Sequence, residues 1–225
     1  YKTEKKDLPT RVNELTFYTT YPLKTFSRGI EEGEIIATAV NNSRDYGNQP
    51  SNKANPSYLV SMAQEVAKTP KVRCKVLNKE EIKQKKMEAL LAVSQGAKHP
   101  PKFIILEYKG KPSSKDWLVF VGKGITFDSG GISIKPGEKM DEMKFDMAGG
   151  GAAISAVEAI ANLKLTINIV ALIPATENLP SGEAYKPGDI IGSAAGKTIE
   201  VINTDAEGRL ILADALHYAK RYKPK

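Results

Sequence analysis

The spacing of apolar residues along the chain predicts alternating helices and strands. Asn55-Pro56 is a favourable helix start, because asparagine is a good N-cap and proline fits the first helical position. Further segments follow from helical or twofold periodicity and from glycine at helix ends. The expected helices begin near Arg28 and at Asn55 and cover 78–96, 147–163 and 207–222; the expected strands cover 71–77, 102–108, 116–121, 166–173, 189–193 and 198–203, with loops over 121–144 and 174–187.

This order of elements predicts an α/β fold. Nearly continuous apolar strands between helices, such as 166–173, indicate a sheet that is covered on both faces. We therefore expect a mixed, mostly parallel sheet with helices on both faces. Ligands of such folds bind at the carboxyl ends of the strands.

Composition sets limits on the class of protein. A chain of 225 residues with 41% hydrophobic residues can bury one sizeable core. No run approaches the ~18 apolar residues of a membrane span and no signal peptide is visible, so we expect a soluble protein without a membrane partner. The single cysteine, Cys74, fits a reducing compartment, here the cytoplasm. With two histidines, a structural zinc site is implausible and any metal should be held by oxygens.

The formal charge of +7 is unevenly distributed. Residues 1–120 carry 21 Lys/Arg against 13 Asp/Glu, whereas residues 121–225 carry 12 against 13. A basic first half can attract nucleic acid or an anionic surface, but lysines scattered over 79–86 are equally typical of a solvated helix face. We treat nucleic acid as an unlikely partner.

The segment Asn203-Thr-Asp-Ala-Glu-Gly-Arg209 carries candidate chemistry where a strand meets a helix. Alternation places Asp205 and Glu207 on one side, so both could bind a metal while backbone amides hold an anion beside Arg209. The alternative is a helix N-terminus with acids that complement its dipole.

Two further segments, 121–136 and 143–150, also follow a strand or begin a helix. With the first segment they bring Lys123, Asp128 and Asp146 to positions where strand ends converge. Four carboxylates in one pocket would repel one another unless cations neutralised them, and two divalent ions would do so. From the residues alone, Lys123 could instead be a cation that pairs with Asp128. The glycine-rich part lacks the order of a phosphate-binding loop.

Together these segments resemble the cytosol (leucyl) aminopeptidase family, the hexameric dimetal exopeptidases that include bacterial aminopeptidase A. N-T-D-A-E-G-R-L is the family signature, and V-G-K-G-I-T-F-D-S-G-G, I-K-P and M-K-F-D-M stand at the family's spacing. The resemblance implies a lead-in from a variable N-terminal domain over 1–27 and a metallopeptidase catalytic domain over 28–225. The family domain continues past the point matching Lys225, so we expect a longer natural chain or a second fragment that completes the domain.

The resemblance also implies a ligand set for two divalent ions, Zn²⁺ or Mn²⁺, with Mg²⁺ or Co²⁺ as further options. Asp128 and Glu207 would bridge both ions, Asp205 would complete the more exchangeable site, and Lys123 with Asp146 would complete the tighter one. An amine binds a metal only when it is deprotonated, so Lys123 would have to lose its proton.

The implied reaction is hydrolysis of the N-terminal peptide bond of peptides that begin with leucine-like residues, through a hydroxide that bridges the two metals. Lys135 would stabilise the carbonyl oxyanion, although it could also be a solvated loop lysine. Arg209, with the backbone of Ala206 and Gly208, would hold a bicarbonate that acts as general base. Arg209 could otherwise pair with an acid.

Met143 would line the pocket for the first substrate side chain, or else belong to the core. The resemblance further implies a homo-hexamer of the full-length protein. The alternative function is a non-catalytic assembly or DNA-binding role through the basic first half.

Overall fold

The computed structural model describes residues 12–224, so the first part of the expected lead-in lies outside the described residues. The chain divides into two compact units, residues 1–34 and 35–225. The first unit contains an edge-to-face contact between Phe17 and Phe26, whose ring centroids are 5.6 Å apart. Helix α1 (Leu23–Asn48) begins a little before the predicted start near Arg28 and continues into the second unit.

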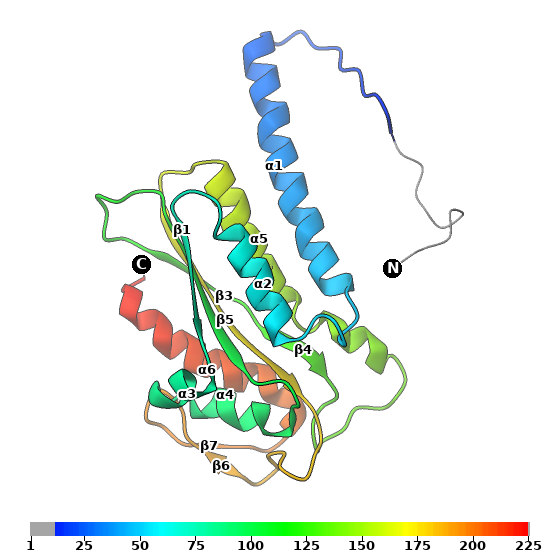
Figure 1. The fold of residues 1–225 in the computed structure, drawn as a ribbon, viewed down its shortest axis with the longest axis vertical. Helices are drawn as coiled ribbons and strands as arrows, with labels where there is room; N and C mark the ends of the chain where they lie inside the picture. The colour runs from blue at the N-terminus through cyan, green and yellow to red at the C-terminus, as the bar shows by residue number, and fades with distance from the viewer. Residues whose placement is uncertain (1–11, 225) are drawn as a thin grey trace. The chain divides into compact units, whose positions relative to one another are not determined.

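A five-stranded mixed sheet forms the centre of the second unit (Figure 1). Its strands lie in the order β1-β2-β5-β3, and β4 also pairs with β5. Only β2 runs against the other four, because β1 and β5 are each antiparallel to it while β3 and β4 are parallel to β5. The strands are β1 (Val72–Leu77), β2 (Lys102–Lys109), β3 (Leu118–Val121), β4 (Gly124–Asp128) and β5 (Asn168–Asn178); β6 (Ile190–Ile191) and β7 (Ile199–Glu200) form a separate antiparallel pair.

Helices cover both faces of the sheet, which confirms the predicted α/β class (Figure 1). The helices of the second unit, besides the end of α1, are α2 (Pro56–Val66), α3 (Lys79–Gln84), α4 (Glu88–Val93), α5 (Ala148–Asn162) and α6 (Glu207–Ala219), with short 3-10 helices η2 (Ser94–Gly96), η3 (Met140–Phe145), η4 (Thr204–Ala206) and η5 (Lys220–Tyr222). No helix among the described residues has the length and apolar character needed to cross a membrane.

The two cores are built from alternate residues of the central strands. Ile104 and Leu106 of β2 pack with α2 and α5 on one face, whereas Phe103 and Ile105 pack with α3, α4 and α6 on the other. All eleven residues of β5 are buried. This two-sided burial explains why residues 169–175 of β5 form an uninterrupted apolar run.

The single helix predicted over 78–96 is wrong, because the chain forms α3, α4 and η2 instead. Its beginning is as expected: Asn78 accepts a hydrogen bond from the backbone of Glu81, whose side chain bonds back to the Asn78 N–H. The break follows at Lys86, which adopts a left-handed conformation with φ of 56°. A helix cannot continue through such a residue.

The loop predicted over 121–144 is also corrected, since it contains β4 and η3. The strand expected to end at Ile173 continues to Asn178, so the loop predicted over 174–187 begins late. Proline removes a ladder donor and is unusual inside a sheet, yet Pro174 lies within β5. In the structure it lies between the last pair of β3 with β5, Val121 with Leu172, and the first pair of β4. On the other side of β5, Pro174 pairs with Phe103 of β2.

Candidate metal centre

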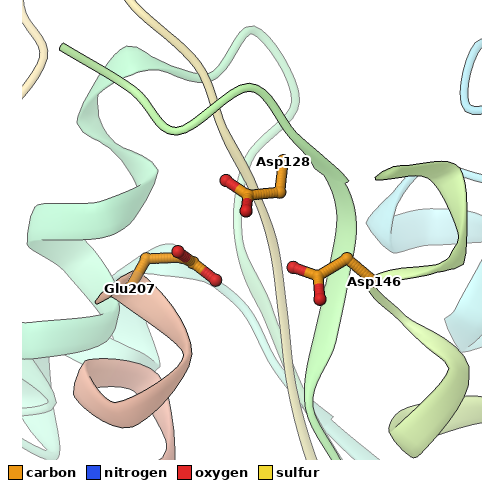
Figure 2. A group of neighbouring side chains, drawn as sticks. All are labelled: Asp128, Asp146 and Glu207. Atoms are coloured by element: carbon orange, nitrogen blue, oxygen red, sulfur yellow. The ribbon is translucent and has the colours of Figure 1, made fainter. Parts of the chain in front are cut away.

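Three carboxylates from distant parts of the sequence meet at one point (Figure 2). Asp128 is the last residue of β4, Asp146 stands between η3 and α5, and Glu207 is the first residue of α6. Each offers an oxygen, and these oxygens all lie within 4.8 Å of one another. Figure 2 shows the three side chains pointing inward toward a common space. We call Asp128, Asp146 and Glu207 the acid cluster.

Two lysines neutralise part of this charge. Lys123 Nζ lies 2.7 Å from Asp146 Oδ2 and 2.7 Å from Glu207 Oε1, so its partners are these acids rather than Asp128. Lys135 Nζ lies 3.0 Å from Asp128 Oδ2 and also pairs with Asp205 Oδ1. The Lys135 side chain is 22% exposed, which is not the state of a freely solvated loop lysine.

The electrostatics favour a cation at this point. Burial raises the pKa of Asp146 and of Glu207, against the opposing effect of Lys123. Burial alone would lower the pKa of Lys123, but its ion pairs with the two acids outweigh burial and raise it. Four carboxylates, Asp205 included, face two ammonium groups. Two negative charges are therefore left without compensation when all groups are ionised.

The residues present fit a divalent cation. Asp146 Oδ2, Asp205 Oδ1 and both oxygens of Glu207 are buried and make no hydrogen bond within the described residues. Three of these oxygens lie in ion pairs with Lys123 or Lys135, whereas Glu207 Oε2 has no such partner among the described residues. Buried oxygens without donors are costly, and carboxylate oxygens are the ligands that hard divalent ions prefer. Divalent metal ions would supply positively charged partners for these carboxylate oxygens.

A tight turn after β4 brings Lys135 back to the acids. Gly130 and Gly131 have φ of 89° and 67°, values that residues with a Cβ rarely adopt. The turn is closed by hydrogen bonds from Gly130 N to Asp128 Oδ1 (2.9 Å) and from Lys135 N to Ser129 O (2.9 Å). The backbone thus fixes Asp128 and Lys135 relative to each other.

Of the other predicted residues, Ala206 directly precedes α6, Gly208 and Arg209 lie in its first turn, and Met143 lies in η3. The exposed side chain of Arg209 lines a cavity of about 360 Å³ together with Ala206, and no hydrogen bond or ion pair within residues 12–224 joins it to the cluster. Gly208 approaches Lys123 instead: a Cβ there would lie 2.9 Å from Lys123 Cε. Met143 lies half-buried in η3.

Sequence reasoning missed four residues that join the parts of this centre by hydrogen bonds: Ser133, Asn178, Tyr185 and Thr204. Thr204 stands inside a recognised motif, but its buried hydroxyl was given no role. Asn178 was missed because the predicted strand ended at Ile173, whereas β5 continues to Asn178. An asparagine recognised at the end of a buried strand would have been a candidate, since its amide has to find partners.

Comparison with known proteins gives one consistent result. A family model described as "Cytosol aminopeptidase family, catalytic domain" matches residues 41–225. A "Probable cytosol aminopeptidase" of Nitrosococcus oceani is 54% identical over 198 residues, 88% of this chain and 40% of the relative. Proteins with the same description from Syntrophotalea carbinolica and Geotalea uraniireducens are 52% and 55% identical over 203 and 195 residues, 90% and 87% of this chain and 41% and 39% of theirs.

The chain thus spans about two fifths of the length of the curated relatives that it matches. These matches do not favour the non-catalytic or DNA-binding alternative. The family match covers the three segments that carry the acid cluster and both lysines. On this evidence the chain belongs to the cytosol aminopeptidase family.

Proposed function

We propose that this chain is part of the catalytic domain of a metal-dependent aminopeptidase that removes leucine-like residues from the amino ends of peptides. The observation that carries the proposal is the convergence of the acid cluster, whose charge the two lysines neutralise only in part, in a member of this family. The relatives' names place them in the cytosol, and we propose the same compartment here.

The proposed metal ligands divide into two groups, in line with the ion pairs of Lys123 and of Lys135. Asp128 and Glu207 would be shared by two ions, Lys123 and Asp146 would complete one position, and Asp205 would complete the other. The contacts of Lys123 with Asp146, and of Lys135 with Asp128 and Asp205, support a division into two positions. When bound, two divalent ions supply Lewis acidity and an activated water near neutral pH.

Lys135 is proposed to stabilise the oxyanion that develops on the scissile carbonyl. Burial alone would lower its pKa, but its ion pairs with Asp205 and Asp128 outweigh burial and raise the pKa, so the side chain stays charged at neutral pH. A preorganised cation aimed at developing negative charge is the largest contribution that one side chain commonly makes to catalysis.

Arg209, Ala206 and Gly208 are proposed to bind a bicarbonate that accepts a proton. The support is local: α6 begins without a side-chain cap, and Arg209 and Ala206 line the same cavity. Free N–H groups at a helix N-terminus beside a guanidinium form a ready anion site. Met143 is proposed to contact the first substrate side chain, and the full-length protein is proposed to form a homo-hexamer.

The test is the release of the chromogenic amine from a leucine anilide by the full-length protein. We expect chelation to abolish release, Mn²⁺ or Zn²⁺ to restore it, and elemental analysis to find two ions per chain. Lys135→Ala should lower the rate by about 100-fold or more while the ions remain bound. A rate that survives both chelation and Glu207→Gln would refute the proposal.

A further inference from the structure

Asn178, the last residue of β5, forms a hydrogen bond with the Asp128 carboxylate. The side chain is fully buried, and its Nδ2 donates to Asp128 Oδ1 (2.8 Å) and to the carbonyl of Thr204 (3.0 Å). Both partners are acceptors, so the amide has to present its NH₂ group to them. This orientation leaves Asn178 Oδ1 buried without a hydrogen bond in the described residues. The contact with Asp128 therefore leaves one buried amide oxygen unsatisfied, which costs free energy of folding.

The bond also decides how Asp128 presents its charge. Oδ1 accepts from Asn178 and from the N–H of Gly130, whereas Oδ2 faces Lys135. With one oxygen held, the carboxylate cannot rotate freely. Hydrogen bonds of this kind orient a ligand before the metal arrives.

Thr204 connects the turn that follows Asp128 to the segment that carries Asp205 and Glu207. Its hydroxyl donates to the carbonyl of Gly130 (2.6 Å) and accepts from Ser133 N (2.8 Å), while its own N–H donates to Ser133 Oγ (3.1 Å). The Thr204 carbonyl accepts from Asn178 and from the hydroxyl of Tyr185 (2.9 Å). Thr204 itself is fully buried.

These bonds connect two segments that lie about seventy residues apart in the chain. The turn of residues 128–135 carries Asp128 and Lys135, and the segment of residues 203–207 carries Asp205 and Glu207. We propose that Asn178 and Thr204 are positioning residues that hold these two segments in register, so that their carboxylates meet at a spacing that binds divalent cations. The inference rests on the proposed function only in treating the acid cluster as a metal site.

The chain offers a matched control for Asn178 on the same strand. Asn168, the first residue of β5, is also buried, and its side chain bonds to the backbone of Lys111, Ser114 and Asp116. Asn178→Ala and Asn168→Ala therefore make the same chemical change at opposite ends of one strand. Both should lower the melting temperature, but only Asn178→Ala should affect cation binding.

The measurement is calorimetric titration of the metal-free full-length protein with Mn²⁺, at a temperature where circular dichroism shows every variant to be folded. We expect Asn178→Ala to weaken Mn²⁺ binding by about 10- to 100-fold, and Asn168→Ala to bind as the wild type does. A second pair tests the hydroxyl: Thr204→Val, which lacks it, should weaken binding, and Thr204→Ser, which keeps it, should restore it.

Equal affinity changes in Asn178→Ala and Asn168→Ala, or wild-type affinity in Asn178→Ala or Thr204→Val, would overturn the positioning roles and leave the proposed function standing. Mn²⁺ binding that depends on Asn178 in a protein that hydrolyses no leucine anilide would support the positioning roles and refute the proposed function. A wild-type protein that binds no Mn²⁺ would refute both.

Discussion

At the scale of single residues, Gly208 shows how closely the backbone of α6 approaches the proposed metal centre. A Cβ at this position would lie 2.9 to 3.0 Å from Cε, Cδ and Nζ of Lys123. Lys123 cannot move aside without cost, because its amine is held between Asp146 and Glu207. A methyl group at Gly208 would therefore push a proposed metal ligand out of place.

We predict that Gly208→Ala lowers leucine anilide hydrolysis by about 100-fold, the effect of a misplacement of ~1 Å in an active site. The melting temperature should change little, since up to ~1 kcal/mol of helix propensity from alanine offsets the cost of displacing Lys123. The measurements are the hydrolysis rate and the melting temperature. Gly182→Ala is the control: among the described residues, its chain neighbours aside, no atom lies within 4 Å of where the added methyl group would stand, so its rate should not change.

Asp214 is a fully buried carboxylate away from the acid cluster. Its Oδ2 accepts from the N–H of Leu90 (3.0 Å) and its Oδ1 from the N–H of Ala194 (2.7 Å). Leu90 lies in the first turn of α4, whose own N-cap, Met87, makes no side-chain bond. Asp214 on α6 therefore caps a neighbouring helix and joins three segments of the second unit.

We predict that Asp214→Ala destabilises the fold by about 1–3 kcal/mol for each buried N–H that loses its acceptor. Burial raises the pKa of Asp214, so its folded pKa lies above the unfolded one. The contribution of protonated Asp214 to the free energy of unfolding is therefore fully present below the unfolded pKa, and it is lost as pH rises through the folded pKa. In urea unfolding, the stability difference between wild type and Asp214→Asn should shrink as pH rises through that window; a constant difference would contradict this.

At the scale of elements, lysine ends two helices where glycine is usual. After α3, Lys86 has φ of 56°, its N–H bonds to Lys83 O (2.9 Å), and Met87 N bonds to Ile82 O (3.2 Å). This is the Schellman arrangement, and Met87 and Ile82 share one core cluster. Lys164 ends α5 with the same pattern and φ of 54°.

We predict that Lys86→Gly stabilises the protein by about 1 kcal/mol, because a left-handed residue with a Cβ costs roughly 1–2 kcal/mol and glycine offsets part of this gain through chain entropy. Urea unfolding of the wild type, Lys86→Gly and Lys86→Ala is the test. Lys86→Ala should show no such gain, since alanine keeps the Cβ, and a gain as large as that of glycine would disprove the explanation.

These helix ends show which parts of the fold could be predicted from the sequence. Asn55 and Asn78 were recognised as helix starts because a cap is a local hydrogen bond with a characteristic residue. The end of α3 was missed, because Lys86 carries no sign of a left-handed backbone and the Ile82–Met87 contact depends on the packed core. The continuation of β5 past Pro174 was missed because it depends on pairing with β2 and β4, which are distant in the sequence.

The candidate site was more predictable than the elements around it. Its carboxylates stand at junctions between elements, and the ends of strands converge in an α/β sheet, so Asp128 and Glu207 could be placed together before any coordinates. Which lysine pairs with which acid could not be predicted, because that depends on side-chain reach. The partners of Asn178 and Thr204 could not be predicted either, since they come from segments that are distant in the chain.

At the scale of the whole molecule, the acid cluster is a local excess of negative charge within a protein of net charge +7. Its carboxylates come from β4, from the segment before α5 and from α6, so it joins the central sheet to helices on both of its faces (Figure 1). Repulsion among the acids opposes this convergence, and a bound cation would favour it. We therefore expect metal binding and folding to be coupled in this unit.

We predict that Mn²⁺ at about 100 times its dissociation constant raises the free energy of unfolding by ~2.7 kcal/mol for each ion bound, because the ions bind the folded state and not the unfolded one. Glu207→Gln should lose most of this gain. Without metal the same variant should be at least as stable as the wild type, since one of the uncompensated charges is gone. Exposed Glu183→Gln is the control and should follow the wild type with and without Mn²⁺. Thermal unfolding of the three proteins, each with chelator and with Mn²⁺, makes the comparison, and an equal gain in Glu207→Gln would show that the ions act elsewhere.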